Sequence, residues 1–177
     1  ETAGSGGLAS GLRPLAETIP GGNVLEIGSG PGWDADTLEE AGLTVRRTDV
    51  TQAFIELQRA RGKEADRLDV SYDELGGPYG GVVALHVLQH IEPDDLPGVL
   101  TKVAGALRPG GYFLVSIPRG EGAAWQVEES GTSYFRALWT EAEFTAALAR
   151  AGLQSAWADR AVPDEERGWL CVLSQLG

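Results

Sequence analysis

The sequence of 177 residues contains one cysteine, no methionine and no long run of apolar residues. The single cysteine, Cys171, has no partner for an internal disulfide and supplies no thiolate cage for a metal, which fits a reducing compartment. No stretch approaches the ~20 apolar residues that span a bilayer, and residues 1–10 are small and Gly-rich, unlike a signal peptide. Because the chain starts at Glu1 without a methionine, we expect further residues upstream. We predict a cytoplasmic protein that binds no membrane.

Basic residues are also scarce, since 14 Lys and Arg against 26 Asp and Glu give a formal net charge of −12. A charge of this sign repels phosphate backbones, so nucleic acid is a disfavoured partner. Hydrophobic residues form 42% of the chain and charged residues 23%, which excludes general disorder. The length is typical of one domain, and no repeat or linker divides it. We predict a single domain over residues 1–177, with an N-terminal helical segment over residues 1–20.

Short apolar runs alternate with helical patterns along the chain. The predicted strands are 23–27, 44–48, 65–68, 81–85, 112–117, 153–159 and 169–176, and the predicted helices are 8–19, 33–41, 52–61, 94–107 and 141–151. We expect Pro109-Gly110-Gly111 to separate helix 94–107 from the next strand. This alternation predicts an α/β fold, a Rossmann-like, doubly wound and mostly parallel seven-stranded sheet with helices on both faces.

The last predicted helix has the strongest local signals. Thr140 and Glu143 have the spacing of a capping box, and Trp139 and Phe144 are placed to form a hydrophobic staple. Gly152 stands where the helix is expected to end.

The first predicted strand ends in the glycine turn Gly28-Ser29-Gly30-Pro31-Gly32. In a doubly wound sheet, ligands bind beyond the carboxyl ends of the strands, and glycines let a ligand approach the backbone closely. A dinucleotide fingerprint requires glycine at position 33, where this chain has Trp33. Asp34 and Asp36, at the start of the next helix, would repel a pyrophosphate. The turn therefore favours a ligand without phosphates, and an NAD(P)-dependent oxidoreductase is the less favoured alternative.

Three acidic residues are expected around the same cleft. Asp49 ends the second strand 21 residues after Gly28 (49 − 28), the spacing at which a carboxylate accepts hydrogen bonds from ribose hydroxyls. Asp69 ends the third strand, where it can accept a bond from an adenine amino group, and Glu26 lies just before the turn. Their structural alternatives are a helix cap, a solvated turn and a purely structural carboxylate, respectively. Three carboxylates around one cleft suit a nucleoside that carries a positive charge.

These motifs resemble the class I S-adenosylmethionine-dependent methyltransferases. The matching segments, in the order of that family, are VLEIGSGPG at 24–32, Asp49, LDV at 68–70, VVALHVLQHI at 82–91 and LRPGGYFLV at 107–115. The resemblance implies S-adenosylmethionine as cofactor, S-adenosylhomocysteine as product, and cofactor contacts from Glu26, Gly28, Ser29, Gly30, Gly32, Asp49, Val50, Asp69, Val70, Leu85 and His86. One departure is Tyr79-Gly80-Gly81, which lacks the aspartate that many relatives carry where the fourth strand begins.

The only two histidines, His86 and His90, follow the fourth predicted strand and are four residues apart. They would share a face if the segment is a helical turn. We predict that one of them is a general base, because imidazole accepts a proton near neutral pH. The alternatives are a packing role or a metal pair completed by Glu92 or Asp94, and we predict no metal. Methyl transfer needs no base when the acceptor arrives deprotonated.

Residues 119–139 form a polar segment with flanking aromatic residues, which we predict to be a loop that covers the substrate. Pocket walls combine aromatic surface with a few polar groups, so the candidate substrate contacts are Trp33, Arg119, Trp125 and Tyr134. We predict methyl transfer to an oxygen or nitrogen of a small molecule. The alternatives are an inactive cofactor-binding module and a methyltransferase that acts on protein. The negative charge weakens the case for an RNA acceptor.

Overall fold

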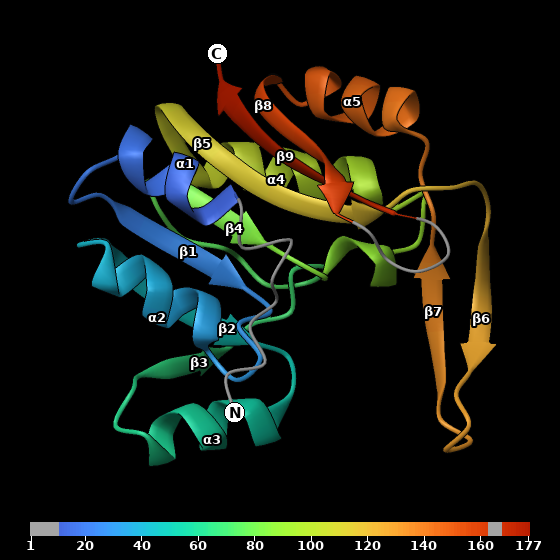
Figure 1. Cartoon of the computed structure of the whole chain (residues 1–177), viewed down its shortest axis with the longest axis horizontal. Coiled ribbons are helices and arrows are strands. Elements are labelled where there is room, and N and C mark those ends of the chain that lie inside the picture. The colour runs from blue at the N-terminus through green and yellow to red at the C-terminus, as the bar shows by residue number, and fades with distance from the viewer. Residues whose placement is uncertain (1–10, 163–167) are drawn as a thin grey trace.

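The structure is a computed structural model that describes residues 11–162 and 168–177. Its main sheet has seven strands in the order β3-β2-β1-β4-β5-β9-β8 (Figure 1). These strands are β1 (Asn23–Ile27), β2 (Thr44–Asp49), β3 (Ala65–Arg67), β4 (Tyr79–Ala84), β5 (Leu107–Pro118), β8 (Leu153–Val162) and β9 (Trp169–Leu176). Strands β1 to β5 pair in parallel, whereas β9 runs antiparallel to both β5 and β8. The mostly parallel, seven-stranded sheet is confirmed.

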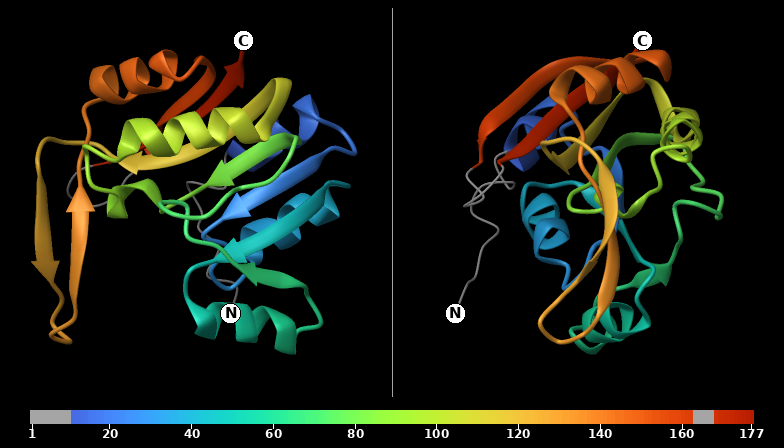
Figure 2. Two further views of the ribbon diagram at one scale, coloured as in Figure 1. Left: turned by 180° about the vertical axis from the view of Figure 1, so that it is seen from behind. Right: turned by 90° about the vertical axis from the view of Figure 1, so that its right-hand side faces the viewer.

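Helices cover both faces of this sheet (Figures 1 and 2). The helices are α1 (Leu12–Thr18), α2 (Trp33–Glu40), α3 (Gln52–Ala60), α4 (Leu96–Ala106) and α5 (Glu141–Arg150), with a 3₁₀ turn η2 (Leu88–His90). Successive strand residues point to opposite faces, so Val24 packs with α1 and α2 while Leu25 packs with α4 and α5. Residues 8–10 of the predicted first helix lie outside the described residues. No helix in the described part of the chain is long and apolar enough to cross a membrane.

The prediction that Pro109-Gly110-Gly111 separates helix from strand is wrong, because β5 begins at Leu107, directly after α4. The register between β4 and β5 shifts at Tyr79/Gly81, as in a β-bulge, and Gly110 there has a φ of +73°. The strand backbones also approach closely, since a Cβ at Gly111 would lie 3.2 Å from the Gly80 carbonyl oxygen. Glycines in both strands therefore let the ladder continue through the proline segment.

The predicted loop 119–139 contains a β-hairpin, so the loop prediction is wrong over much of its length. Strands β6 (Ala123–Val127) and β7 (Ser133–Ala137) form a separate antiparallel sheet that projects from the body of the molecule (Figures 1 and 2). Their aromatic and β-branched residues favour strands, and Gly131, with a φ of +84°, lies in the connecting turn. The polar composition of the segment concealed these signals.

Helix α5 begins as predicted. The hydroxyl oxygen of Thr140 accepts a bond of 3.2 Å from the Glu143 amide, and the Glu143 carboxylate accepts one of 3.1 Å from the Thr140 amide. The rings of Trp139 and Phe144 are 6.4 Å apart between centroids. This capping box and staple fix the point at which the hairpin segment rejoins the body.

Candidate active site

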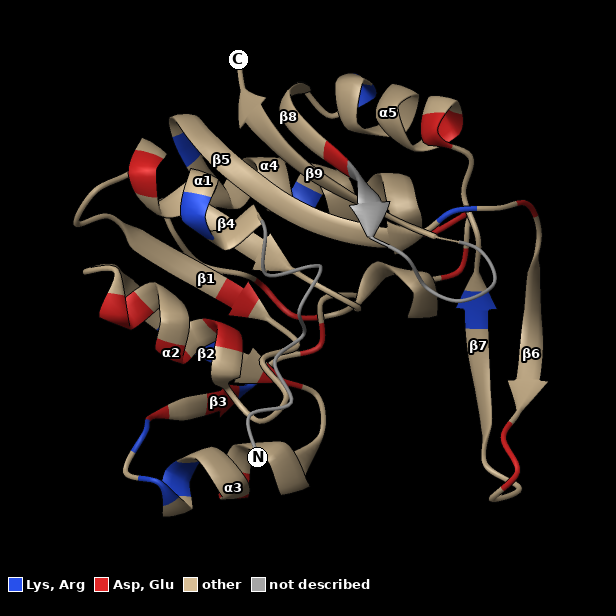
Figure 3. Cartoon of the chain, in the orientation of Figure 1, with Lys and Arg blue, Asp and Glu red and all other residues tan. Residues whose placement is uncertain are grey.

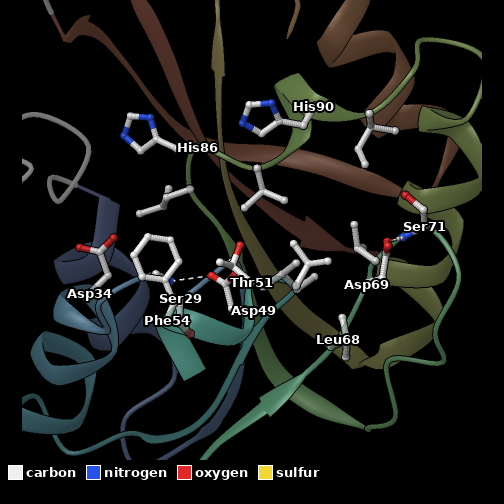
Figure 4. A pocket seen from close by; sticks show the side chains of 18 of the residues that line it. Ser29, Asp34, Asp49, Thr51, Phe54, Leu68, Asp69, Ser71, His86 and His90 are labelled. Atoms are coloured by element: carbon white, nitrogen blue, oxygen red, sulfur yellow. Dashed lines mark hydrogen bonds between the residues drawn. The ribbon is translucent and has the colours of Figure 1, made fainter. Parts of the chain in front are cut away.

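A cavity of about 540 Å³ opens where β1, β2, β3 and β4 end (Figure 4). The predicted site residues among its lining are Gly28, Ser29, Gly30, Asp49, Val50, Asp69, Val70, Leu85, His86 and His90. These residues follow four different strands, so the parallel sheet brings together side chains that are far apart in the sequence. The lining also includes residues that were not predicted for the site, among them Asp34, Thr51, Phe54 and Ser71.

Six predicted site residues do not line this cavity, namely Glu26, Gly32, Trp33, Arg119, Trp125 and Tyr134. Trp33 and Trp125 are 54% and 68% exposed, respectively. The Arg119 guanidinium lies against Gly168, where a Cβ would come within 2.6 Å of its Nη2. Tyr134 is nearer the cavity, because its ring lies 6.3 Å from that of His90 between centroids.

Two glycines of the turn, Gly30 and Gly32, have different surroundings. Gly32 has a φ of +87°, and a Cβ there would come within 2.6 Å of Gln58 Oε1 and 2.7 Å of Arg47 Nη1. Gly30 has a φ of +53°, and a Cβ there would meet no atom within 4 Å. Gly32 is therefore required by side chains packed beneath the turn, whereas Gly30 leaves open space beside the cavity.

The side chains beneath the turn form a buried polar cluster. Arg47, on β2, is 1% exposed at its side chain and donates to the Gly32 carbonyl and to Gln58 Oε1, each at 3.2 Å. Gln58, on α3, donates to the Gly30 carbonyl at 2.9 Å. A buried arginine and a buried glutamine thus hold two carbonyls of the turn. The sequence analysis missed both, because neither lies in a motif.

Arg47 also binds two carboxylates of α2, those of Asp36 at 2.7 Å and Glu39 at 2.8 Å. Asp36 pairs in addition with Arg61. Burial alone would raise the pKa of Asp36, but the bonds from Arg47 and Arg61 hold it below its usual value. The expectation that Asp36 would repel a pyrophosphate is wrong, because its charge is neutralised by these arginines. Asp34 is the helix acid that lines the cavity.

Asp49 connects the turn to the following helix. It is 6% exposed, its Oδ2 accepts a bond of 2.8 Å from the Gly30 amide, and its Oδ1 accepts one of 2.8 Å from the Thr51 amide. Each carboxylate oxygen retains a further lone pair for a ligand donor. Asp69 similarly accepts a bond of 2.9 Å from the Ser71 amide. Figure 4 shows Asp34 and Asp69 at opposite ends of the cavity.

Glu26 has a different position from the one expected. Its carboxylate is 3% exposed and accepts a bond of 2.5 Å from the Ser29 hydroxyl, outside the cavity lining. Burial raises the pKa of Glu26 to about 7, and the bond from Ser29 opposes this rise. The three acids of the cleft are thus Asp34, Asp49 and Asp69.

The two histidines contact different elements, and because η2 spans only Leu88–His90, they do not share the face of one helical turn. His86 precedes η2, has a φ of +58°, and donates its amide to Ser116 Oγ at 2.9 Å. Its ring lies 4.3 Å from that of Trp169 between centroids. His90 ends η2, and its Nδ1 lies 3.0 Å from the Phe135 carbonyl oxygen. A carbonyl only accepts, so Nδ1 carries the proton and neutral His90 keeps its lone pair at Nε2.

No group of three or more His, Cys, Asp or Glu side chains is arranged to hold a metal ion in the described part of the chain. The described residues that line the cavity include carboxylates and no Lys or Arg. Opposite charges attract strongly across a partly dry pocket, and the volume is that of a small-molecule site. The lining therefore fits a nucleoside that carries positive charge.

Comparison with known proteins gives a consistent result. A family model described as a methyltransferase domain matches residues 5–157. A probable S-adenosylmethionine-dependent methyltransferase of Mycolicibacterium smegmatis is 34% identical over 107 residues, covering 59% of this chain and 41% of that protein. A ubiquinone biosynthesis O-methyltransferase of Xanthomonas campestris is 26% identical over 129 residues, covering 68% and 53%. The chain thus spans about half the length of these relatives.

Solved structures share the fold at low sequence identity. A S-adenosylmethionine-dependent methyltransferase of Mesorhizobium loti superposes with a TM-score of 0.77 at 17% identity, covering 94% of this chain and 96% of that one. The 1,6-didemethyltoxoflavin-N1-methyltransferase of Burkholderia thailandensis, solved with S-adenosylhomocysteine, gives a TM-score of 0.76 at 21% identity, covering 96% and 77%.

Proposed function

The chain belongs to the methyltransferase domain family, and from that premise we propose that it transfers a methyl group from S-adenosylmethionine to an oxygen or nitrogen of a small molecule. The observation that carries the proposal is the cavity lining, with open space at Gly30, carboxylates at Asp49 and Asp69, and no Lys or Arg from residues 11–162 or 168–177. The similar proteins are named for O-methylation and N1-methylation, which supports an oxygen or nitrogen acceptor.

Each lining carboxylate has a role in this proposal. Asp49 accepts bonds from the ribose hydroxyls through the lone pairs that the Gly30 and Thr51 amides leave. Asp69 and Val70 face the adenine. Asp34, at the opposite end of the cavity from Asp69 (Figure 4), would lie beside the cationic methionine part.

When bound, S-adenosylmethionine would supply an electrophilic methyl carbon to the acceptor atom. His90 is the proposed general base, because the Phe135 carbonyl holds its Nδ1 proton and leaves Nε2 to accept the proton of the acceptor. His86, with its ring against Trp169, borders the same end of the cavity. The protein then contributes alignment and proton acceptance.

Calorimetric titration with S-adenosylhomocysteine tests the cofactor site. We expect Asp49→Ala to weaken binding about tenfold or more, or about 1.4 kcal/mol. Glu40→Gln removes one negative charge from an exposed position on α2 and is expected to leave binding unchanged. Binding of NADH in place of S-adenosylhomocysteine would overturn the proposal.

Turnover with small phenols and amines, followed as S-adenosylhomocysteine formed, tests the acceptor. We expect His90→Gln to lower turnover while leaving S-adenosylhomocysteine affinity within twofold. A protein that binds the cofactor yet methylates only polypeptides would contradict the small-molecule part of the proposal.

A further inference from the structure

The hairpin of β6 and β7 turns one face toward the histidine end of the cavity. Alternate residues of a strand share a face, so Tyr134 and Arg136 lie together on β7, with Gln126 opposite Tyr134 on β6. The Tyr134 ring contacts His90, and its hydroxyl donates to Gln126 Oε1 at 2.9 Å. Trp125, opposite Phe135, belongs to the other face. The inward face therefore consists of Ala124, Gln126, Tyr134 and Arg136.

This inward face lies next to His90, outside the residues that line the cavity. Arg136 is half-buried, and its guanidinium carbon lies 5.9 Å from the centre of the Trp169 ring. Trp169 contacts the His86 ring, and His86 lines the cavity. One unbroken series of contacts thus leads from the cofactor cavity to a guanidinium.

Arg136 stands out by its charge. Among the described residues, the cavity lining carries carboxylates and no Lys or Arg, so Arg136 is a cation adjoining an acidic site. It forms no ion pair with any other described residue. A guanidinium that stacks on an aromatic ring keeps its planar fork of donors available to a carboxylate.

We propose that Gln126, Tyr134, Arg136 and Trp169 form an acceptor subsite for a planar aromatic acid, whose carboxylate binds Arg136 while its ring packs against the aromatic side chains. The proposal rests on the proposed function, because it places the acceptor beside His90 and His86. It narrows the acceptor from any small molecule to one that carries an anionic group next to an aromatic ring. Such pairing is bidentate and charge-assisted, which makes it selective against neutral analogues.

Calorimetry on the full chain saturated with S-adenosylhomocysteine tests the subsite with two probes, 4-hydroxybenzoate and its neutral counterpart 4-hydroxybenzamide. We expect the acid to bind at least tenfold more tightly than the amide. Arg136→Gln is expected to abolish this preference by weakening the acid alone, and Arg136→Lys to retain part of it because the charge remains. Arg150→Gln, which removes the same charge from an exposed position on α5, is the matched control and leaves both affinities unchanged.

Equal affinity for the two probes, no binding of either, or a preference that survives Arg136→Gln would overturn the subsite. S-adenosylhomocysteine affinity, measured for each variant before the probes are added, shows that the variant is folded. The same measurement on the unmodified chain separates the two proposals. If that chain does not bind S-adenosylhomocysteine, the proposed function itself is refuted. Cofactor binding without a preference for the acid refutes only the subsite.

Discussion

Two regions, one lining the cavity and the other beside it, are built in opposite ways. The turn wall, residues 28–32 with Arg47 and Gln58 beneath them, is held by buried hydrogen bonds to the Gly30 and Gly32 carbonyls. The hairpin wall, the inward face of β6 and β7, touches the body through ring contacts and one bond to His90. Figure 3 shows the same contrast in charge, with charged residues concentrated around α2, β2 and β3 and sparse along β7.

This difference separates the tasks of the two walls. A buried guanidinium with several partners has one low-energy arrangement, so the turn wall is rigid and suits a cofactor of constant shape. Ring contacts at the surface are individually weak and are easily rearranged. The hairpin wall therefore suits an acceptor whose shape can change without disturbing the cofactor site.

The largest expected effect comes from replacing Arg47, which lies beneath the turn and holds the turn wall rigid. We expect Arg47→Met to lower the free energy of unfolding in urea by about 2–3 kcal/mol, because it leaves buried acceptors without a partner. This loss of unfolding free energy is smaller than that for breaking a fully buried ion pair, since Asp36 still pairs with Arg61 and Glu39 still pairs with Lys63. Arg46→Met, at a side chain that is 38% exposed, is the control with a smaller expected loss. Equal losses would contradict a rigid turn wall.

Two alanine substitutions divide the turn wall into its two sides. We expect Gly32→Ala to cost about 2 kcal/mol of unfolding free energy, since left-handed backbone costs ~1–2 kcal/mol for an L residue and the new methyl meets Arg47 and Gln58. Gly30→Ala has the same backbone penalty without the clash. Its methyl would take up open space beside the cavity, so S-adenosylhomocysteine affinity is expected to fall. If Gly30→Ala destabilises the fold more than Gly32→Ala, the assignment of the two sides is wrong.

The buried carboxyl of Glu26 makes the stability of the turn wall depend on pH. Its pKa is about 7 in the folded chain against 4.5 for a free side chain, so between these values the folded state holds a proton that the unfolded state has released. Stability contributed by this group therefore falls as pH rises through that window, by at most about 1.4 kcal/mol per pH unit.

Glu26→Gln cannot ionise, and we expect it to remove this slope from urea unfolding measured at pH 5.5 and 6.5. Glu40→Gln, at an exposed carboxyl, is expected to retain the slope. An unchanged slope in Glu26→Gln would show that another group titrates.

The smallest expected effect is on the outer face of the hairpin. Trp125 is 68% exposed and its ring contacts Phe135 at 6.0 Å between centroids. We expect Trp125→Ser to change unfolding free energy by about 0.5 kcal/mol or less and to leave aromatic-acid binding intact. A large loss of binding would place the acceptor on the face opposite Tyr134.

The turn wall was the more predictable of the two from sequence. Lining residues lie at or just beyond the ends of the strands, such as Asp49 at the end of β2 and Asp69 two residues after β3, so local pattern and chain order were sufficient. The same reasoning failed for Arg47, because its partners come from two helices whose packing is not encoded in neighbouring residues. It failed for Glu26 because a strand residue before the turn can face the core as well as the ligand.

The hairpin wall was concealed because its signals compete. Residues 128–132 are polar and typical of a loop, whereas the flanking aromatic residues favour strands, and the loop interpretation prevailed. Arg136 lies in no sequence motif. Its role can be inferred only once β7 is known to be a strand beside η2, because this places Arg136 on the same face as Tyr134. A site whose residues come from different elements can be identified only once the fold is known.

His86 has a left-handed backbone, a conformation in which glycine is far more comfortable than histidine. A selection for thermal tolerance alone would therefore enrich glycine or asparagine at this position, whereas a selection for turnover would retain the histidine if its ring serves the reaction. Stability and activity are thus expected to favour different residues at position 86. Selecting one library of variants at position 86 for thermal tolerance and, separately, for turnover would show whether activity requires the strained histidine.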